Sequence, residues 1–273
     1  MRQVELHHGV ATDVGHVRAT NEDSFLAEPP LYVVADGMGG HDGGEVASRI
    51  VVEEFGRLAD AGWDPLGGPA AIGAALARCQ QQIKEYDAAQ RRAGSLQFHS
   101  ATTAVVAMLV EDGGQPAWLV ANVGDSRAYR FCDGRLEQVT VDHSRVQELW
   151  EAGEITEAEI AGHPERNVVT RAVGGPRRPE ADFFLLPLPV AERLLLASDG
   201  IFGMIAHGQV EDIVATSSDP RDAADRLVAA ALAAGGRDNA TAVVVDVMGL
   251  ASENSYDSAR QRVSLEQKLG ALP

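Results

Sequence analysis

Apolar residues recur at helical spacing in the first third of the chain and again near its end. In the stretch 45–59, Val46, Ile50 and Phe55 fall on one helical face, because spacings of three and four residues repeat once per turn. Other stretches show the same spacing or end at helix-stopping glycines. The helices predicted in this way are 45–59, 70–92, 144–152, 156–161 and 221–234.

Short runs of consecutive apolar residues predict strands that are buried on both faces. They cover residues 24–28, 31–36, 102–111, 117–125, 127–131, 135–139, 182–188, 193–199 and 241–247. The short connections at 112–116 and 132–135 indicate hairpins and therefore antiparallel pairing. Since the helices do not alternate with the strands, the pattern favours an α+β fold in which helices cover antiparallel sheets.

The segment at about 144–175 interrupts this strand-rich region, and we expect it to be an inserted flap. Residues 1–248 are predicted to form one catalytic domain that includes the flap. The remaining residues, 249–273, are polar with weak periodicity, so a helical or partly disordered tail is expected there.

Charge narrows the possible functions. The chain has 273 residues, with 23 Lys and Arg against 40 Asp and Glu, and a formal net charge of −17. Such a surface argues against binding to nucleic acid and to anionic membranes. There is no apolar run long enough to span a membrane and no signal-peptide pattern. The two cysteines, Cys79 and Cys132, cannot form a disulfide framework, which favours the reducing cytoplasm.

Acidic residues stand at the ends of several predicted strands. Asp36, Asp125 and Asp199 each follow an apolar run and precede a small residue, Asp238 precedes the last strand, and the pair 22–23 precedes the first. A single Asp-Gly at a strand end is more often a turn than a ligand. A whole set of buried carboxylates is costly unless it is compensated, and Mg²⁺ or Mn²⁺ prefers such oxygen ligands.

Seven ordered motifs strengthen this interpretation. They are RATNEDS, VADGMGGHDGGEVAS, GDSRAYR, VDHS, HPERNVVTRAVG, LLLASDG and GGRDNATAVVV. Together they span roughly residues 8–247 and resemble the metal-dependent protein serine/threonine phosphatases of the phosphatase 2C (PPM) type, bacterial branch. The resemblance implies a β-sandwich of two antiparallel sheets flanked by helix pairs, an αββα arrangement.

The resemblance also implies two or three bound Mg²⁺ or Mn²⁺ ions. Asp36 corresponds to the acid that bridges two ions, and the carbonyl of Gly37 to a further ligand. Asp199 and Asp238 correspond to the remaining ligands of the first ion. Asp125, together with Asp199, corresponds to the site of a third and weaker ion.

Four more residues receive roles from the same likeness. Glu22 corresponds to the acid that holds the waters of the second ion, with Asp23 beside it. Arg18 corresponds to the residue that binds the substrate phosphate, and Asn239 is expected to brace the site. Arg18, Glu22 and Asp36 are therefore the predicted catalytic residues.

The expected chemistry is direct attack on the phosphoryl group by a hydroxide that bridges two metal ions, without a phosphorylated enzyme intermediate. Many eukaryotic members have His directly after the Asp-Gly pair, where this chain has Met38. The general acid is then either a metal-bound water or His41. His143 and His163, which flank the flap, are expected to make structural hydrogen bonds.

The predicted function is dephosphorylation of phosphoserine and phosphothreonine in proteins by a cytoplasmic monomer. It would oppose a bacterial Ser/Thr kinase, with a type VI secretion system as one context. Basic residues in or after the flap are interpreted either as steering the phosphoprotein or as solvated surface. They are Arg166, Arg171, Arg177 and Arg178.

Three other functions compete with this one. A pseudophosphatase would lack part of the acid set, yet every expected acid is present. A phosphatase of anti-sigma-factor antagonists often carries sensory domains, for which this chain has little room. A metal nuclease would need a basic groove, which the net charge opposes.

Overall fold

The computed structural model describes residues 4–39, 43–188 and 193–250. The strands are β1 (Val4–Asp13), β2 (Asp23–Glu28), β3 (Leu31–Gly39), β4 (Ser100–Thr102), β5 (Ala104–Asp112), β6 (Gln115–Val123), β7 (Arg127–Cys132), β8 (Arg135–Gln138), β9 (Asp182–Pro187), β10 (Arg193–Ala197) and β11 (Ala240–Leu250). The helices are α1 (Gly43–Ala61), α2 (Gly68–Arg92), α3 (Arg145–Glu151), α4 (Glu157–Ile160), α5 (Asp199–Phe202), α6 (His207–Thr216) and α7 (Pro220–Ala233).

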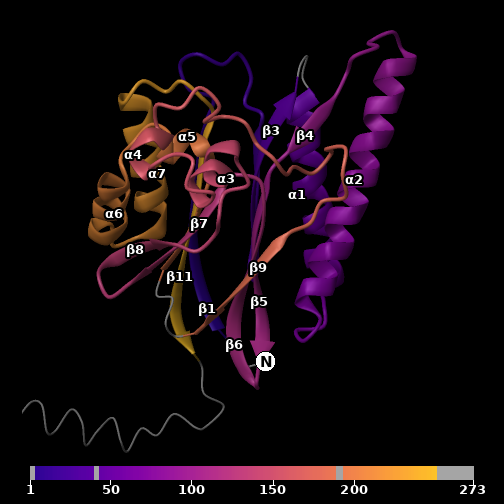
Figure 1. Ribbon diagram of the computed structural model, residues 1–273. Coiled ribbons are helices and arrows are strands. Elements are labelled where there is room, and N and C mark those ends of the chain that lie inside the picture. The colour runs from indigo at the N-terminus through magenta and orange to yellow at the C-terminus, as the bar shows by residue number, and fades with distance from the viewer. Residues whose placement is uncertain (1–3, 40–42, 189–192, 251–273) are drawn as a thin grey trace, which may run out of the picture.

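Two antiparallel sheets form the centre of the molecule (Figure 1). One has the order β1-β11-β10-β7-β8, and the other β2-β3-β5-β6-β9 with β4 paired to β3. Both predicted hairpins are present, at Asp112↔Gln115 and Cys132↔Arg135. Side chains from the facing sides of the two sheets, among them Tyr32, form one apolar core between them.

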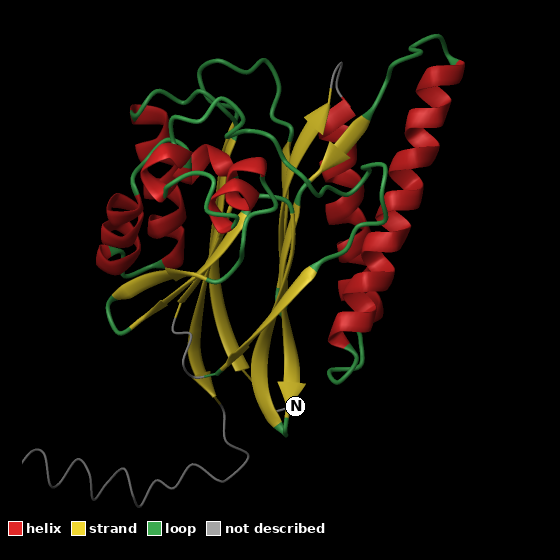
Figure 2. Cartoon of the chain, in the orientation of Figure 1, coloured by secondary structure: helices red, strands yellow, loops and turns green. Residues whose placement is uncertain are grey.

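Helices cover the two outer faces (Figure 2). The side chains of α1 and α2, including Phe55 and Ile72, form a second apolar core with β3, β5 and β6. Those of α5, α6 and α7, including Leu227, form a third with β7, β10 and β11. The layers are therefore helix, sheet, sheet, helix, and the expected α+β sandwich is confirmed. In the described ranges, no helix is both long and apolar enough to cross a membrane.

The segment between β8 and β9 carries α3 and α4, in the region where the flap was expected. It lies beside α5 at the edge of the helical layer formed by α5, α6 and α7 (Figure 1). The expected tail is only partly described: Gly249 and Leu250 end β11, whereas 251–273 lie outside the described residues, as does His41.

Four elements were not predicted from the sequence, among them β4, which has three residues and shares only Thr102 with the strand expected at 102–111. β1 is an edge strand whose side chains are mostly half-buried or exposed, so its apolar positions are interrupted by polar ones. α5 has only four residues, too few to show a helical period. α6 has only three buried residues, Val210, Ile213 and Val214, so its apolar stripe is weak.

Candidate active site

Strand pairing brings the predicted acids to one end of the sandwich. Asp36 in β3 and Asp23 in β2 are register partners. Asp199 begins α5 directly after β10, and Asp238 lies just before β11, which pairs with β10. A Cβ atom on Gly200 would lie 1.8 Å from the carbonyl oxygen of Asn239. Glycine is therefore required there, and its absence of a side chain lets α5 approach the start of β11.

Gly37 holds the loop of Glu22 against β3 in a similar way. Its N–H donates to the Glu22 carbonyl oxygen at 3.1 Å. A Cβ atom on Gly37 would lie 2.2 Å from the Gly44 carbonyl oxygen and 2.6 Å from that of Glu22. Only glycine allows this three-way backbone contact. The Glu22 side chain itself packs beside Gly44, at the start of α1.

Buried hydroxyl groups fix the backbone of Asp36. Its N–H donates to Thr103 Oγ1 at 2.9 Å, and its carbonyl accepts from Thr103 N and from Thr102 Oγ1, both at 2.9 Å. Thr103 Oγ1 also lies 2.7 Å from the hydroxyl of Ser126, the residue after Asp125. Thr103 therefore links the backbones that carry two of the predicted ligands. Nothing in the sequence motifs indicated this bridging role of Thr103.

Asp23 is a buried acid with only partial compensation. Its Oδ2 accepts hydrogen bonds from Ser198 Oγ and Thr241 Oγ1, both at 2.7 Å. Its Oδ1 is buried and has no hydrogen-bond partner. Burial, together with the nearby charges of Asp199 and Asp238, raises the pKa of Asp23 to about 7 despite the two hydroxyl donors.

The other acids disfavour each other's ionisation. Burial, followed by repulsion from Asp23, Asp199, Asp125 and Asp238, raises the pKa of Asp36 well above its usual value. Burial and Asp238 raise the pKa of Asp199, although a hydrogen bond with Asp36 opposes the shift. Burial and Asp199 raise the pKa of Asp125 to about 7. Five predicted acids thus lie close enough to interact strongly.

One arginine faces this acid cluster. Arg18 Nη2 lies 2.8 Å from Asp238 Oδ2. Its pKa is raised, first by this hydrogen bond, and also by the charges of Asp238, Glu22 and Asp36, while burial lowers it. The side chain is half exposed. Arg18 is therefore both at the acid cluster and accessible to a substrate.

The donor set fits a hard divalent cation in its chemistry. Within the described parts of the chain, no three His, Cys, Asp or Glu side chains are arranged so that they could hold a metal ion as they stand. Two acids have other partners, because Asp238 pairs with Arg18 and Asp23 accepts from two hydroxyls. Yet all the donors are oxygens, their charges are poorly balanced, and Asp23 Oδ1 has no partner. A divalent cation prefers oxygen ligands, and it would balance the negative charge and give Asp23 Oδ1 a partner.

Asn239 connects this cluster with the loop of Arg18. Its Oδ1 accepts from the Glu22 N–H at 2.8 Å, and its Nδ2 donates to the carbonyl oxygens of Val14 and Thr20 at 2.9 and 3.0 Å. The amide therefore holds both ends of the segment that carries Arg18. Asn239 thus makes contacts that a bracing residue would make, and the bracing role itself stays a prediction.

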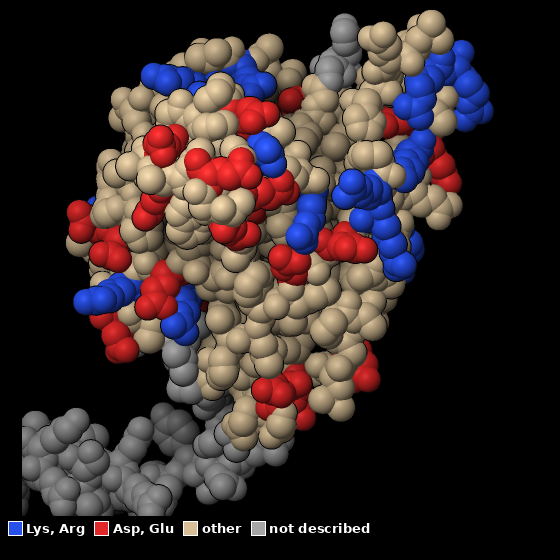
Figure 3. Space-filling model, viewed as in Figure 1, with Lys and Arg blue, Asp and Glu red and all other residues tan. Residues whose placement is uncertain are grey.

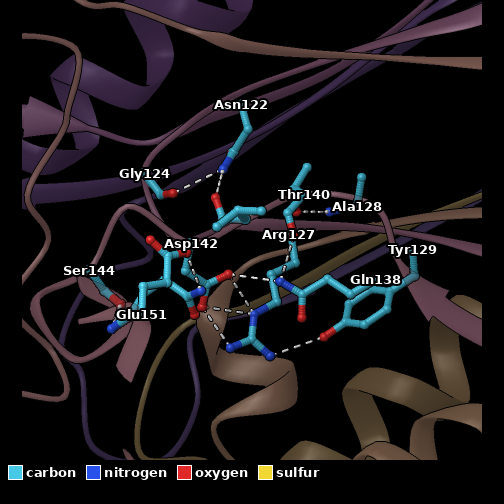
Figure 4. A network of polar contacts seen from close by, with 12 residues as sticks. Asn122, Gly124, Arg127, Ala128, Tyr129, Gln138, Thr140, Asp142, Ser144 and Glu151 are labelled. Carbon is cyan, nitrogen blue, oxygen red and sulfur yellow. Dashed lines mark hydrogen bonds and ion pairs between the residues drawn. The ribbon is translucent and has the colours of Figure 1, made fainter. Parts of the chain in front are cut away.

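A network of polar contacts around Arg127 and Asp142 fastens the base of the flap to β7 (Figure 4). Arg127 forms a forked ion pair with Asp142, with Nε–Oδ1 at 2.9 Å and Nη2–Oδ2 at 2.6 Å. Arg127 also donates to Tyr129 Oη at 3.1 Å, and its guanidinium carbon lies 4.0 Å from the ring centroid of Phe202. A forked arginine–carboxylate pair is directional. It therefore orients the flap relative to the acid cluster, which was not predicted.

His143 supports the same region. Its Nδ1 accepts from the Gly124 N–H at 3.1 Å, and its Nε2 lies 3.1 Å from Asp182 Oδ2. Because Nδ1 is an acceptor, Nε2 carries the proton and donates to the carboxylate. Burial lowers the pKa of His143 although Asp182 raises it. These contacts agree with the structural role expected for His143.

The four arginines expected to cluster around the flap are separated by the fold. Arg171 pairs with Asp182 at 2.9 Å. The backbone of Arg177 lies beside α2, because Gln80 Nε2 donates to its carbonyl oxygen at 3.0 Å. On the face shown in Figure 3, basic side chains gather over α2, whereas acidic ones predominate over the half with α3, α4 and α5. Of these four arginines, Arg166 alone lines the cavity that adjoins the acid cluster.

Comparisons with known proteins agree with this geometry. A family model described as protein phosphatase 2C matches residues 16–234. The serine/threonine phosphatase stp of Listeria welshimeri is 32% identical over 248 residues, which are 88% of this chain and 96% of the relative.

Two solved structures have the same fold. The catalytic domain of the serine/threonine protein phosphatase PstP, in complex with two manganese ions, has a TM-score of 0.77 and 32% identity, covering 90% of this chain and 100% of that one. PppA, described as a key regulatory component of T6SS in Pseudomonas aeruginosa, has a TM-score of 0.75 and 31% identity, covering 89% and 98%. With the ordered motifs and the converging acids, these likenesses show that the chain belongs to the protein phosphatase 2C family of serine/threonine phosphatases.

Proposed function

We propose that this phosphatase removes phosphate from phosphoserine and phosphothreonine in proteins and depends on Mg²⁺ or Mn²⁺. The observation that carries the proposal is the convergence of Asp23, Asp36, Asp125, Asp199 and Asp238 beside one accessible arginine. A phosphate dianion would be repelled by these acids alone, so the site makes chemical sense only when cations offset their charge.

Each residue has a role in this proposal. Asp36, Gly37, Asp199 and Asp238 would hold the first cation, and Asp36, Glu22 and Asp23 would serve a second. A third, weaker site would use Asp125 with Asp199. The list follows the family pattern position by position.

When bound, the cations would lower the pKa of a water molecule toward neutrality and offset charge on the transferring phosphoryl group. Arg18 binds the phosphoryl oxygens with its planar donors, exchanging its contact with Asp238 for the substrate. Asn239 holds the segment on which Arg18 lies, and Thr103 keeps Asp36 in register with the loop of Asp125. No protein nucleophile takes part, so no phosphorylated enzyme accumulates.

One set of assays tests the proposal. The purified chain is incubated with p-nitrophenyl phosphate, phosphothreonine peptides, a phosphorylated anti-sigma-factor antagonist and DNA, each with Mn²⁺ and with chelator. We expect Mn²⁺-dependent release of phosphate from the first two and no cleavage of DNA. Inactivity toward every phosphoester would indicate a pseudophosphatase, and preference for the antagonist would indicate that related function.

Arg18→Ala then tests the substrate-binding role. Since the guanidinium binds the phosphoryl group, the KM should rise by about tenfold or more. An unchanged KM would contradict the assignment of Arg18. Arg49→Ala, which removes an exposed arginine from an ion pair on α1, is the matched control.

The cellular context is also part of the proposal. We place the protein in the cytoplasm as a monomer, opposing a bacterial Ser/Thr kinase. Two cysteines, Cys79 and Cys132, are too few for a disulfide framework, which supports a reducing compartment. Likeness to PppA supports a type VI secretion system as one setting.

A further inference from the structure

A cavity of about 380 Å³ extends from the acid cluster toward the flap. Asp125, Asp199 and Asp238 line one part of it. The flap contributes Val146 and Ile160. Since Asp238 pairs with Arg18, the cavity begins where the substrate phosphate is proposed to bind. It is therefore placed to receive residues next to the phosphorylated one.

Two arginines in this cavity have no acidic partner. Arg127 and Asp142, which also line it, neutralise each other in the forked ion pair. Arg166 from the flap and Arg237 from the loop before β11 make no ion pair with any residue in the described ranges. Both residues are exposed, so their guanidinium groups are accessible to a ligand.

Apolar side chains, among them Phe202 and Met204, line the same cavity as these arginines. The Arg237 side chain lies beside Met204, because a Cβ atom built on Gly235 would lie 3.4 Å from Met204 Cε and 3.9 Å from Arg237 Nε. Arg166 and Arg237 are themselves exposed, so the apolar side chains offer packing surface for the aliphatic part of a bound side chain, while the guanidinium groups offer charge-assisted donors.

We propose that Arg166 and Arg237 bind an anionic side chain of the substrate, a carboxylate or a second phosphate, adjacent to the phosphorylated residue. The proposal rests on the proposed function and specifies its substrate class. A guanidinium matches both anions through two parallel N–H donors. The volume is at the lower end for ligand pockets, which suits one side chain of a peptide. The acids of the cavity do not oppose this binding once their charge is offset by cations.

The test compares phosphothreonine peptides that differ only in the neighbouring residues. One peptide has neutral neighbours, a second has Glu on either side, and a third has a second phosphothreonine. Measured with Mn²⁺, kcat/KM should be about five- to tenfold higher for the two anionic peptides. The ratio of anionic to neutral peptide should fall toward one as NaCl is raised, since salt screens partly exposed charges.

Variants locate the effect. In Arg237→Gln and in Arg166→Gln, the same ratio should fall at least threefold, mainly through KM, and Arg237→Lys should restore part of it. The matched control is Arg178→Gln, an exposed arginine beside α2 that loses the same charge outside the cavity. Because each ratio is taken within one protein, a general loss of activity does not affect it.

The outcomes separate the two proposals. If the neutral phosphopeptide is not hydrolysed with Mn²⁺, the proposed function is wrong. If it is hydrolysed but the wild-type ratio is near one, only the inference about the cavity fails. An equal fall of the ratio in Arg178→Gln would overturn it as well, because the preference would then reflect overall charge. A preference for one anionic peptide alone identifies whether a carboxylate or a phosphate is bound.

Discussion

The two ends of the strand pair β10–β11 carry charged residues that differ in how well they are paired. At one end, Asp199 and Asp238 lie among other acids, and burial with mutual repulsion raises the pKa of Asp199. At the other end, Arg193 and Asp246 are register partners that form a forked ion pair at 2.6 and 2.8 Å. Arg193 also donates to the carbonyl oxygens of Val214 and Ser217.

The difference separates a structural charge from a functional one. The Arg193–Asp246 pair is complete within the fold: each partner is 9% exposed and well supplied with hydrogen bonds. The acid cluster is incomplete, since its five carboxylates repel one another, and of the two arginines whose charge acts on them, Arg18 and Arg127, the second is already paired with Asp142. A buried charge that the fold leaves uncompensated indicates a site for something the chain does not itself provide.

The largest expected effect is on activity, at the acid end. Asp36→Asn keeps the shape of the side chain but removes a bridging ligand, so phosphatase activity should fall about 1000-fold or more. The free energy of unfolding without metal should stay equal or rise, because a repelling charge is lost. Initial rates with p-nitrophenyl phosphate and thermal melts with chelator measure the two quantities.

Mn²⁺ provides a second readout for this variant. A ligand at a hundred times its Kd stabilises the native state by about 2.7 kcal/mol, so Mn²⁺ should raise the Tm of the wild type. In Asp36→Asn the rise should be mostly lost. Activity above a tenth of the wild-type value would contradict the role of Asp36.

The next effect is on stability, at the other end. Arg193→Met leaves Asp246 buried without its partner, and the free energy of unfolding should fall by about 3–5 kcal/mol. Arg193 is roughly 13 Å along the strand from Ala197, so kcat of the folded protein should change less than about twofold. Chemical denaturation and steady-state kinetics test this separation.

A double variant controls for lost packing. In Arg193→Met combined with Asp246→Leu, the unpaired charge is removed, and part of the lost stability should return. If Arg193→Met loses activity without losing stability, the ion pair contributes to catalysis, and the division into a structural end and a functional end is wrong.

The smallest effect depends on pH and comes from Asp23. Its pKa in the folded protein is raised to about 7 from 3.8, so its ionisation destabilises the metal-free fold. This cost is absent below about pH 4 and complete above about pH 7, because the folded state holds the proton longer. Asp23→Asn should therefore gain stability relative to the wild type as the pH rises from 4 to 8, and differ from it least near pH 4.

Denaturation in chelator at both pH values measures this difference. The control is Asp112→Asn, an exposed acid in the hairpin between β5 and β6, which should show no gain at pH 8. Equal stability of Asp23→Asn and wild type at pH 8 would mean that ionisation of the Asp23 carboxyl does not destabilise the folded protein.

Periodicity predicted most of the fold because it records burial directly. The α1 and α2 stripes and the continuous apolar runs of β5 and β6 agree with the structure. The β1 strand was missed because polar residues interrupt its apolar positions, and α5 because four residues show no period. The spacing of the hairpins predicted the fold class, but the order of the strands in each sheet could not be predicted from the sequence.

Each acid of the candidate site could be predicted from the sequence, but the side chains that each charged or polar residue contacts could not. Arg166 and Arg171 are five residues apart, but one lines the cavity and the other pairs with Asp182. The hydroxyl groups of Thr103 and Ser126 form a hydrogen bond although the two residues are far apart in the sequence. Side-chain partners at this range depend on strand register and loop packing, which no sequence spacing specifies.

Taken alone, the sequence determined the family motifs, the set of acids and the layered α+β class, since these depend on residue type and local period. Tertiary structure decided that Arg18 faces Asp238, that Arg193 neutralises Asp246, and that Arg166 shares a cavity with Arg237. The physical reason is that the alternation of buried and exposed positions depends on neighbouring residues in the sequence. The partners of a charged side chain instead come from segments up to 220 residues apart.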